Sequence, residues 1–362
     1  MPQPKTARLA PFIFLTPVLL WLAVFRMANP AEVRADEDVV YSAPVLERDD
    51  SFIRGIALGL YDKRPGADYD DELEEIAEHN ANTVSLVVTW SQQDLHSMVI
   101  GPDDEETRPD EAVIEAIEDA HDEGLHVLLF PILKLRERGV GHWRGVIHPV
   151  DASQWFASYT EFILHYARMA EAHGVEYLSI GSELGTMEVF EEEWLQLIGQ
   201  VREVFSGKLT YSANWDHYDH PTFWDALDLI GMTGYYELAE SADPPPNVGL
   251  VAKAWEPIVE RLVAFSQEHQ RPFIFTELGY YSQRTTAWRP WDYTMDGEVD
   301  LESQRACYQA FYEVWRDVPE FNGVFFWHWY GDGGPYDNSY NPRDKPAAEL
   351  IEFWYGSYGG MN

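Results

Sequence analysis

The chain has 362 residues, 46% of them hydrophobic and 14% aromatic, and a formal net charge of -37. This hydrophobic content is too high for a disordered chain, and charged residues interrupt it too often for a multispan membrane protein. The strong negative charge argues against nucleic acid as a partner, because it would repel the phosphates. We therefore expect a globular protein that binds no nucleic acid.

The first 35 residues differ in composition from the rest of the chain. Lys5 and Arg8 precede a mostly apolar run from Leu9 to Phe25, which is typical of an export signal or a signal anchor. We expect an extracytoplasmic protein, either anchored in a membrane through this segment or secreted after its cleavage. Residues 36–50 then form an acidic linker, and residues 51–362 form one domain.

From Ser51 onward, short apolar runs rich in β-branched and aromatic residues alternate with longer amphipathic stretches, a pattern typical of parallel strands joined by helices. Eight strands are expected, over Ile53–Leu60, Thr83–Trp90, His126–Leu133, Tyr177–Glu183, Leu209–Asn214, Leu229–Tyr235, Phe273–Glu277 and Gly323–Trp329. Eight such units predict an α/β fold, a (β/α)8 TIM barrel. A helix is expected between the fourth and fifth strands, with Gly207 as its C-cap.

Two of the eight runs end in a glutamate, Glu183 after the fourth and Glu277 after the seventh. Because chemistry in such barrels occurs at the carboxyl ends of the strands, these two side chains can meet across one cleft. Hydrolysis of a glycosidic bond needs two carboxyl groups, one that protonates the leaving oxygen and one that attacks or stabilises the sugar. The alternative is that each glutamate caps a helix or pairs with a basic residue.

Aromatic residues also gather near the strand ends, where flat rings could bind the apolar faces of sugars. They are Trp90, Trp143, Trp215, Tyr235, Tyr236, Trp327 and Trp329, although each tryptophan could equally be part of the core or wall. Asn214 ends the fifth run, and Lys134 and Arg144 near the third could donate to sugar hydroxyls or form ion pairs. The loop with Asp216, His217, Asp219 and His220 matches no zinc motif. We expect no metal and no cofactor.

Several strings of this sequence resemble glycoside hydrolase family 113, a (β/α)8 group best known for β-mannanases. The strings include Trp143-Arg144-Gly145, the run from Ile180 to Leu184, the run from Gly207 to Asp216, the run from Phe275 to Tyr280 and Lys345-Pro346-Ala347. They occur in order over nearly the whole domain. The resemblance implies a retaining double displacement on β-linked mannose-type substrates, with Glu183 as acid/base and Glu277 as nucleophile.

The resemblance also implies roles for two aromatic residues. Tyr235 would hydrogen-bond the nucleophile, and Trp327 would form the floor of the subsite where the bond is cleaved. One position departs from the pattern, because many related enzymes have Asn before the acid/base and this chain has Ser182. The expected function is hydrolysis of a neutral β-mannan. The alternatives are a β-glucan or other β-glycan hydrolase, and a tethered carbohydrate-binding protein without catalysis.

Overall fold

The structure is a computed structural model that describes residues 51–62 and 68–358. The expected signal or anchor segment and the acidic linker, residues 1–35 and 36–50, lie outside the described residues, so both stay predictions. Within the described ranges, no helix is both long and apolar enough to cross a membrane. These residues all belong to one compact unit.

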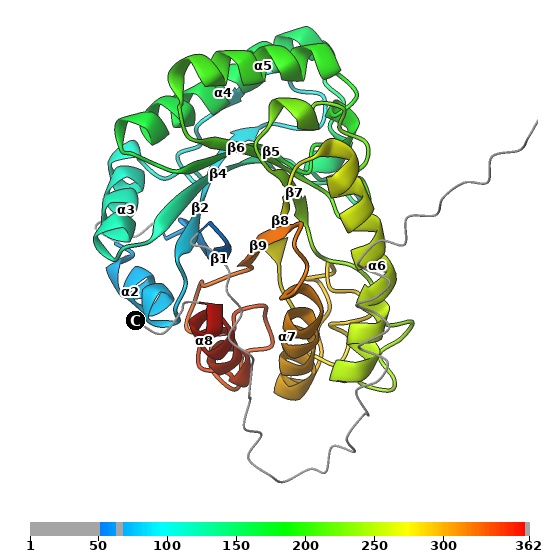
Figure 1. The fold of residues 1–362 in the computed structure, drawn as a ribbon. Coiled ribbons are helices and arrows are strands. Elements are labelled where there is room, and N and C mark those ends of the chain that lie inside the picture. Colours follow the sequence, from blue (N-terminus) through cyan, green and yellow to red (C-terminus); the bar gives the residue numbers. More distant parts are fainter. Residues whose placement is uncertain (1–50, 63–67, 359–362) are drawn as a thin grey trace, which may run out of the picture. The chain divides into compact units, whose positions relative to one another are not determined.

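Eight parallel strands form a closed barrel with helices around it (Figure 1). β1 pairs with β2 on one side and with the last strand, β9, on the other, which closes the ring. The predicted TIM barrel is therefore confirmed. The strands are β1 (Ile53–Gly59), β2 (Thr83–Gln92), β4 (His126–Leu135), β5 (Tyr177–Ser182), β6 (Lys208–Ala213), β7 (Ile230–Thr233), β8 (Phe273–Leu278) and β9 (Phe321–Phe326).

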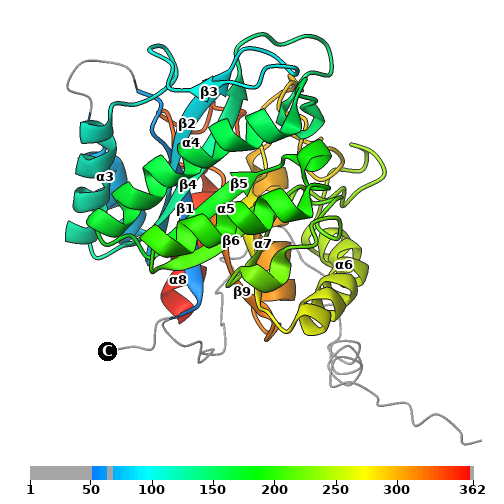
Figure 2. The same cartoon turned by 90° about the horizontal axis from the view of Figure 1, so that it is seen from above.

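Long helices cover the outside of the barrel and pack apolar side chains against it. They are α2 (Asp70–Glu78), α3 (Asp110–Asp122), α4 (Ala152–Ala172), α5 (Glu191–Val204), α6 (Val248–His269), α7 (Leu301–Trp315) and α8 (Pro346–Tyr358). Figure 2 shows α4 and α5 side by side next to β5 and β6. In α5, residues Trp194, Leu197, Ile198 and Val201 are buried at helical spacing, as the sequence predicts.

Gly207 does not cap α5, so that prediction is wrong. The helix ends at Val204 and the chain continues through Phe205 in an extended conformation. A Cβ atom added to Gly207 would lie 2.7 Å from the carbonyl oxygen of Glu176. The glycine is therefore explained by the close approach of two backbone segments where β6 begins.

The connection from β6 to β7 contains no long helix, although the repeating pattern predicted one there. A short 3-10 helix, Trp224–Ala226, takes its place. Trp224 is fully buried, and Phe223 stacks on Trp194 of α5 with ring centroids 5.0 Å apart. Bulky aromatic side chains thus fill the volume that a helix would otherwise occupy.

The interior of the barrel is packed with apolar side chains and is not a channel. This cluster comprises Ile53, Val87, Leu128, Phe130, Ile132, Tyr177, Leu229, Ile274 and Phe325, with Tyr61 and Trp327 packed against it. A further short strand, β3 (Ile100–Gly101), pairs antiparallel with the end of β2. The cluster supports the carboxyl ends of the strands, where both predicted glutamates lie.

Candidate active site

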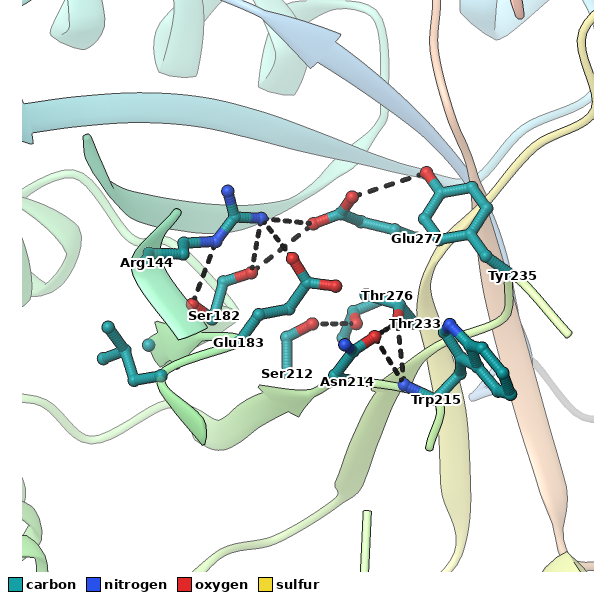
Figure 3. A network of polar contacts seen from close by, with 12 residues as sticks. Arg144, Ser182, Glu183, Ser212, Asn214, Trp215, Thr233, Tyr235, Thr276 and Glu277 are labelled. Atoms are coloured by element: carbon teal, nitrogen blue, oxygen red, sulfur yellow. Dashed lines mark hydrogen bonds and ion pairs between the residues drawn. The ribbon is translucent and has the colours of Figure 1, made fainter. Parts of the chain in front are cut away.

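Glu183 and Glu277 face each other across the barrel mouth and share one guanidinium group (Figure 3). Arg144 Nη2 lies 2.6 Å from Glu183 Oε2 and 3.9 Å from Glu277 Oε1. Because both distances are measured from the same nitrogen atom, the two oxygens can be at most 2.6 + 3.9 = 6.5 Å apart. The structure thus brings together two carboxylates that are 94 residues apart in the sequence.

Glu183 has an unusual backbone conformation directly after β5. Its φ angle is +52°, in the left-handed region that side chains other than glycine rarely adopt. Its own N–H donates to the carbonyl of Ser212 on β6 at 2.8 Å. Arg144 Nε donates to the carbonyl of Ser182 at 3.1 Å, so the same arginine also fixes the strand end before Glu183.

Glu277 is almost completely buried, with 5% of its surface exposed. It accepts a hydrogen bond from the Tyr235 hydroxyl at 3.4 Å and another from the Ser182 hydroxyl at 3.5 Å. Burial raises the pKa of Glu277 to about 8, and the nearby charge of Glu183 acts in the same direction. Arg144 and the two hydrogen bonds oppose this rise, because they stabilise the charged form.

Tyr61 is a site residue that the sequence analysis missed. It lies two residues after the end of β1 and packs against the barrel core. Burial and the charge of Glu277 both raise the pKa of its hydroxyl, so the ring lies close to the carboxylate pair and stays neutral. The Lys134 ammonium lies 4.8 Å from the centroid of the Tyr61 ring. The rule that strand ends carry function, applied to β1, could have found it.

Arg144 was left open in the sequence as a hydroxyl donor or an ion-pair partner. The structure shows it as an ion-pair partner, whose side chain is only 22% exposed. It lies in the short 3-10 helix Arg144–Val146, beyond the end of β4. No pattern within this loop distinguishes it from a surface arginine, since its partners come from β5 and β8.

Asn214, Trp215 and Trp327 lie on the same side of the barrel mouth as Tyr235. Asn214 Oδ1 accepts from the Trp215 N–H at 3.0 Å and from the Thr233 hydroxyl at 3.3 Å. Trp215 and Trp327 are partly buried and pack against a cluster of Tyr235, Tyr281 and Tyr340. These rings could form one wall of a sugar-binding cleft, and their predicted contacts with substrate stay predictions.

Three other predicted substrate-binding residues lie elsewhere around the mouth. Trp90 stacks on Phe162 of α4 with centroids 5.2 Å apart. Lys134 forms an ion pair with Glu106 at 2.7 Å, and Trp143, 40% exposed, directly precedes Arg144. Trp90 also lines a hollow of about 680 Å³ with Tyr61, Glu106 and the adjoining acidic loop. Sugar binding by these residues stays a prediction.

Two of the aromatic residues singled out in the sequence belong to the wall. Trp329 is 1% exposed, and its indole N–H donates to Glu75 of α2 at 2.9 Å. Tyr236 is buried and packs against Trp215 and Trp255.

In the loop after β6, His217 pairs with Asp216 at 2.6 Å. Within residues 51–62 and 68–358, no three His, Cys, Asp or Glu side chains gather as a metal site would require.

Comparison with known proteins agrees with this geometry. The model of glycoside hydrolase family 113 matches residues 59–345. The chain belongs to this family. It is therefore a glycoside hydrolase, and the carboxylate pair is its candidate catalytic centre. None of the curated proteins matches the sequence.

Solved structures of the same family superpose over nearly their whole length. The β-mannanase AaManA from Alicyclobacillus acidocaldarius, in complex with ManMIm, is 29% identical, with a TM-score of 0.76 over 85% of this chain and 98% of that one. A β-1,4-mannanase is 26% identical, with a TM-score of 0.75 over 84% and 99%. Ruminococcus gnavus β-glucuronidase, 14% identical with a TM-score of 0.56, covers 84% of this chain and 50% of its own and shares the fold alone.

Proposed function

We propose that this glycoside hydrolase cleaves β-linked mannose polymers with retention of configuration. The observation that carries the proposal is the contact of one guanidinium with both Glu183 and Glu277. Retaining enzymes place their carboxyl groups about 5 to 5.5 Å apart, whereas inverting enzymes need roughly 6.5 to 9.5 Å for a water molecule. The facing oxygens are at most 6.5 Å apart, at or below the lower edge of the inverting range, which supports the retaining class.

In the proposed reaction, Glu183 donates a proton to the glycosidic oxygen while a carboxylate oxygen of Glu277 attacks the anomeric carbon. The bond to the leaving sugar breaks, and a glycosyl ester forms on Glu277. Glu183 then takes a proton from water, whose oxygen attacks the anomeric carbon and releases Glu277. The Tyr235 hydroxyl, 3.4 Å from Glu277 Oε2, orients the attacking group.

The charge distribution without substrate differs from the one that this reaction needs. Burial favours a proton on Glu277, whereas the Arg144 guanidinium lies closer to Glu183 than to Glu277. The reaction needs a charged Glu277. We expect Arg144 to move toward Glu277 when a sugar occupies the cleft, because the two carboxylates compete for one nitrogen atom.

Mannan is the proposed substrate because two family relatives, 26% and 29% identical, are β-mannanases. The formal net charge of -37 also favours a neutral polysaccharide over an anionic one. Reducing-sugar release should be highest on mannan, lower on glucomannan and lowest on cello-oligosaccharides. Faster release from cello-oligosaccharides would make the chain a β-glucan hydrolase, and binding of mannan without release would make it a carbohydrate-binding protein.

The two roles can be separated by adding azide to variants supplied with an activated aryl β-mannoside. In Glu277→Ala, azide should replace the nucleophile and give the α-mannosyl azide. In Glu183→Ala, the glycosyl ester still forms and azide should give the β-mannosyl azide. If each variant gave the azide expected of the other, the roles of Glu183 and Glu277 would be the reverse of those proposed. A Glu277→Ala variant as active as the wild type would refute both roles. The product profile on mannohexaose then distinguishes internal from terminal cleavage.

We also propose that the enzyme acts outside the cytoplasm. The support is the sequence of residues 1–35, in which basic residues precede an apolar run. Cell fractionation of the full chain should recover activity outside the cytoplasm, in the membrane fraction if the segment stays attached and in the medium if it is cleaved. Activity confined to the cytoplasm would contradict the proposal.

A further inference from the structure

A buried carboxyl group that the reaction does not use lies behind the candidate acid/base. Glu188 is 1% exposed and follows the short 3-10 helix Gly185–Met187 in the connection between β5 and α5. Its Oε1 accepts a hydrogen bond from the Tyr211 hydroxyl at 2.8 Å. Its Oε2 is buried without a hydrogen-bond partner in the described part of the chain. Burial of an incompletely paired carboxyl group is costly and therefore needs an explanation.

Tyr211 connects this carboxyl group to the backbone next to Glu183. It lies on β6, is fully buried, and its hydroxyl accepts a hydrogen bond from the N–H of Leu184 at 2.9 Å. A hydroxyl has only one proton, and Glu188 receives it. The lone pairs of the oxygen are then left to face Leu184. Glu188 thus determines which way the Tyr211 hydroxyl points.

The backbone at Glu183 needs such support. A positive φ at a residue other than glycine costs about 1 to 3 kcal/mol and persists only where the surroundings enforce it. The N–H of Glu183 is held by Ser212, and the next N–H, that of Leu184, is held by Tyr211. Both peptide groups around Glu183 are therefore anchored to β6.

We propose that Glu188 is a positioning residue for the acid/base. Through Tyr211 it fixes the turn at Glu183 and so aims the Glu183 carboxyl group at the glycosidic oxygen. This inference rests on the proposed role of Glu183. The contact does not need a charged Glu188, because a proton on the unpaired Oε2 leaves Oε1 able to accept from Tyr211.

The surroundings of Glu188 agree with a group that works in its neutral form. Burial raises the pKa of Glu188 to about 7, and the hydrogen bond from Tyr211 opposes this rise. His217 also lowers the pKa, while Glu183 and Asp216 raise it. A glutamine at this position should therefore keep the contact, whereas an apolar residue should lose it.

The test compares two substrates that differ in their need for an acid. Mannohexaose requires protonation of its leaving group, whereas 2,4-dinitrophenyl β-mannobioside has a leaving group that departs without it. In Glu188→Met and in Tyr211→Phe, kcat/KM on mannohexaose should fall at least tenfold more than on the aryl substrate. In Glu188→Gln, the ratio of the two kcat/KM values should stay within threefold of the wild type. This ratio does not depend on the folded fraction, which scales both rates equally.

Tyr159→Phe is the matched control. It also removes a buried tyrosine hydroxyl bonded to β5, since the Tyr159 hydroxyl donates to the carbonyl of Ile180 at 2.9 Å. The ratio of kcat/KM on mannohexaose to kcat/KM on the aryl substrate should be the same in Tyr159→Phe as in the wild type. The proposal is overturned if Glu188→Met and Tyr211→Phe leave the ratio unchanged, or if Tyr159→Phe changes it as much as they do.

A further variant separates this inference from the proposed function. Glu183→Gln should show the largest loss of mannohexaose cleavage relative to the aryl substrate. If Glu183→Gln keeps the wild-type ratio, the acid/base role of Glu183 is wrong, and the role of Glu188 is overturned with it. If only Glu188→Met and Tyr211→Phe keep the ratio, the positioning role alone is wrong. Cello-oligosaccharides and their dinitrophenyl glycosides replace these substrates if the wild type prefers glucose.

Discussion

At the scale of single residues, the Arg144 guanidinium interacts with both carboxyl groups of the site. It contacts Glu183 directly and lies 3.9 Å from Glu277. Its positive charge stabilises the ionised form of a glutamate that burial otherwise keeps protonated. Arg144 therefore lowers the pKa of the proposed nucleophile, as do the hydrogen bonds from Tyr235 and Ser182.

Replacing Arg144 with methionine should make Glu277 harder to ionise. The acidic limb of the pH profile of kcat/KM should move to higher pH, and activity at pH 6 should fall at least about tenfold, the effect of one pKa unit on a group that must be charged. Arg305→Met removes an arginine that pairs with Glu302 on the outside of α7, and it should leave the profile unchanged. An unaltered profile in Arg144→Met would refute the role of the arginine.

Glu277 should also make stability depend on pH. The pKa of Glu277 is about 8 in the folded state and ordinarily 4.5, so between these pH values the folded state holds a proton that the unfolded state has lost. Stability from this group is thus fully present below pH 4.5 and is lost as the pH rises to 8. Glu277→Gln, which cannot ionise, should gain stability over the wild type on the order of 3 kcal/mol between pH 5 and pH 8.

Urea unfolding at the two pH values measures this gain. Glu260→Gln on the exposed side of α6 is the control and should show no such difference. If the free energies of unfolding of Glu277→Gln and the wild type differed by the same amount at pH 5 and pH 8, the raised pKa of Glu277 would be contradicted. The experiment also shows how much stability the site gives up for its chemistry.

The sequence predicted the two glutamates because each ends an apolar run, and such runs can be located from local patterns. Tyr61 and Arg144 were not identified as members of the pair's surroundings. Tyr61 lies two residues after β1, so the rule that strand ends carry function could have identified it, whereas Arg144 lies in a loop whose course depends on contacts with distant segments. A local pattern contains no information on such contacts, so the role of Arg144 required the structure.

At the scale of elements, the connection between β6 and β7 departs most from the regular barrel. It has a three-residue 3-10 helix in place of a long one, and buried aromatic rings cover the strands there. The strand positions followed from alternating apolar runs and were predicted well. The missing helix was not, because the same residues that would form an apolar helix face here fill a space between β6 and α5.

Trp224→Ala should therefore destabilise the fold strongly. Trp224 is fully buried, and loss of such a side chain typically costs about 3 to 5 kcal/mol. Urea unfolding measures the loss, with Trp291→Ala, which removes a 42% exposed tryptophan, as the control. A loss as small as that of the control would show that the aromatic packing does not replace the helix.

At the scale of the whole molecule, charge repulsion is the dominant electrostatic feature. With a formal net charge of -37, the folded chain holds many carboxylates close together. Salt screens such interactions over distances of about 10 Å at 0.1 M and about 3 Å at 1 M. Screening should stabilise the compact state more than the expanded one.

The melting temperature at pH 7 should therefore rise by several degrees between 50 mM and 1 M sodium chloride. This rise corresponds to a gain in the free energy of unfolding on the order of 1 to 2 kcal/mol. At pH 5, where carboxylates begin to take up protons, the same salt series should give a smaller rise. A melting temperature that is independent of salt at pH 7 would show that the acidic side chains are too far apart to repel one another.

The pairing of β1 with β9 also has a consequence for synthesis in the cell. A nascent chain that ends before Phe321 lacks the strand that joins the two sides, so β1 and β8 are both left as open edges. Open edges are templates for pairing with other chains. The ribosome must therefore synthesise the chain as far as β9 before the ring can close, and products that end earlier should be found in inclusion bodies or bound to chaperones.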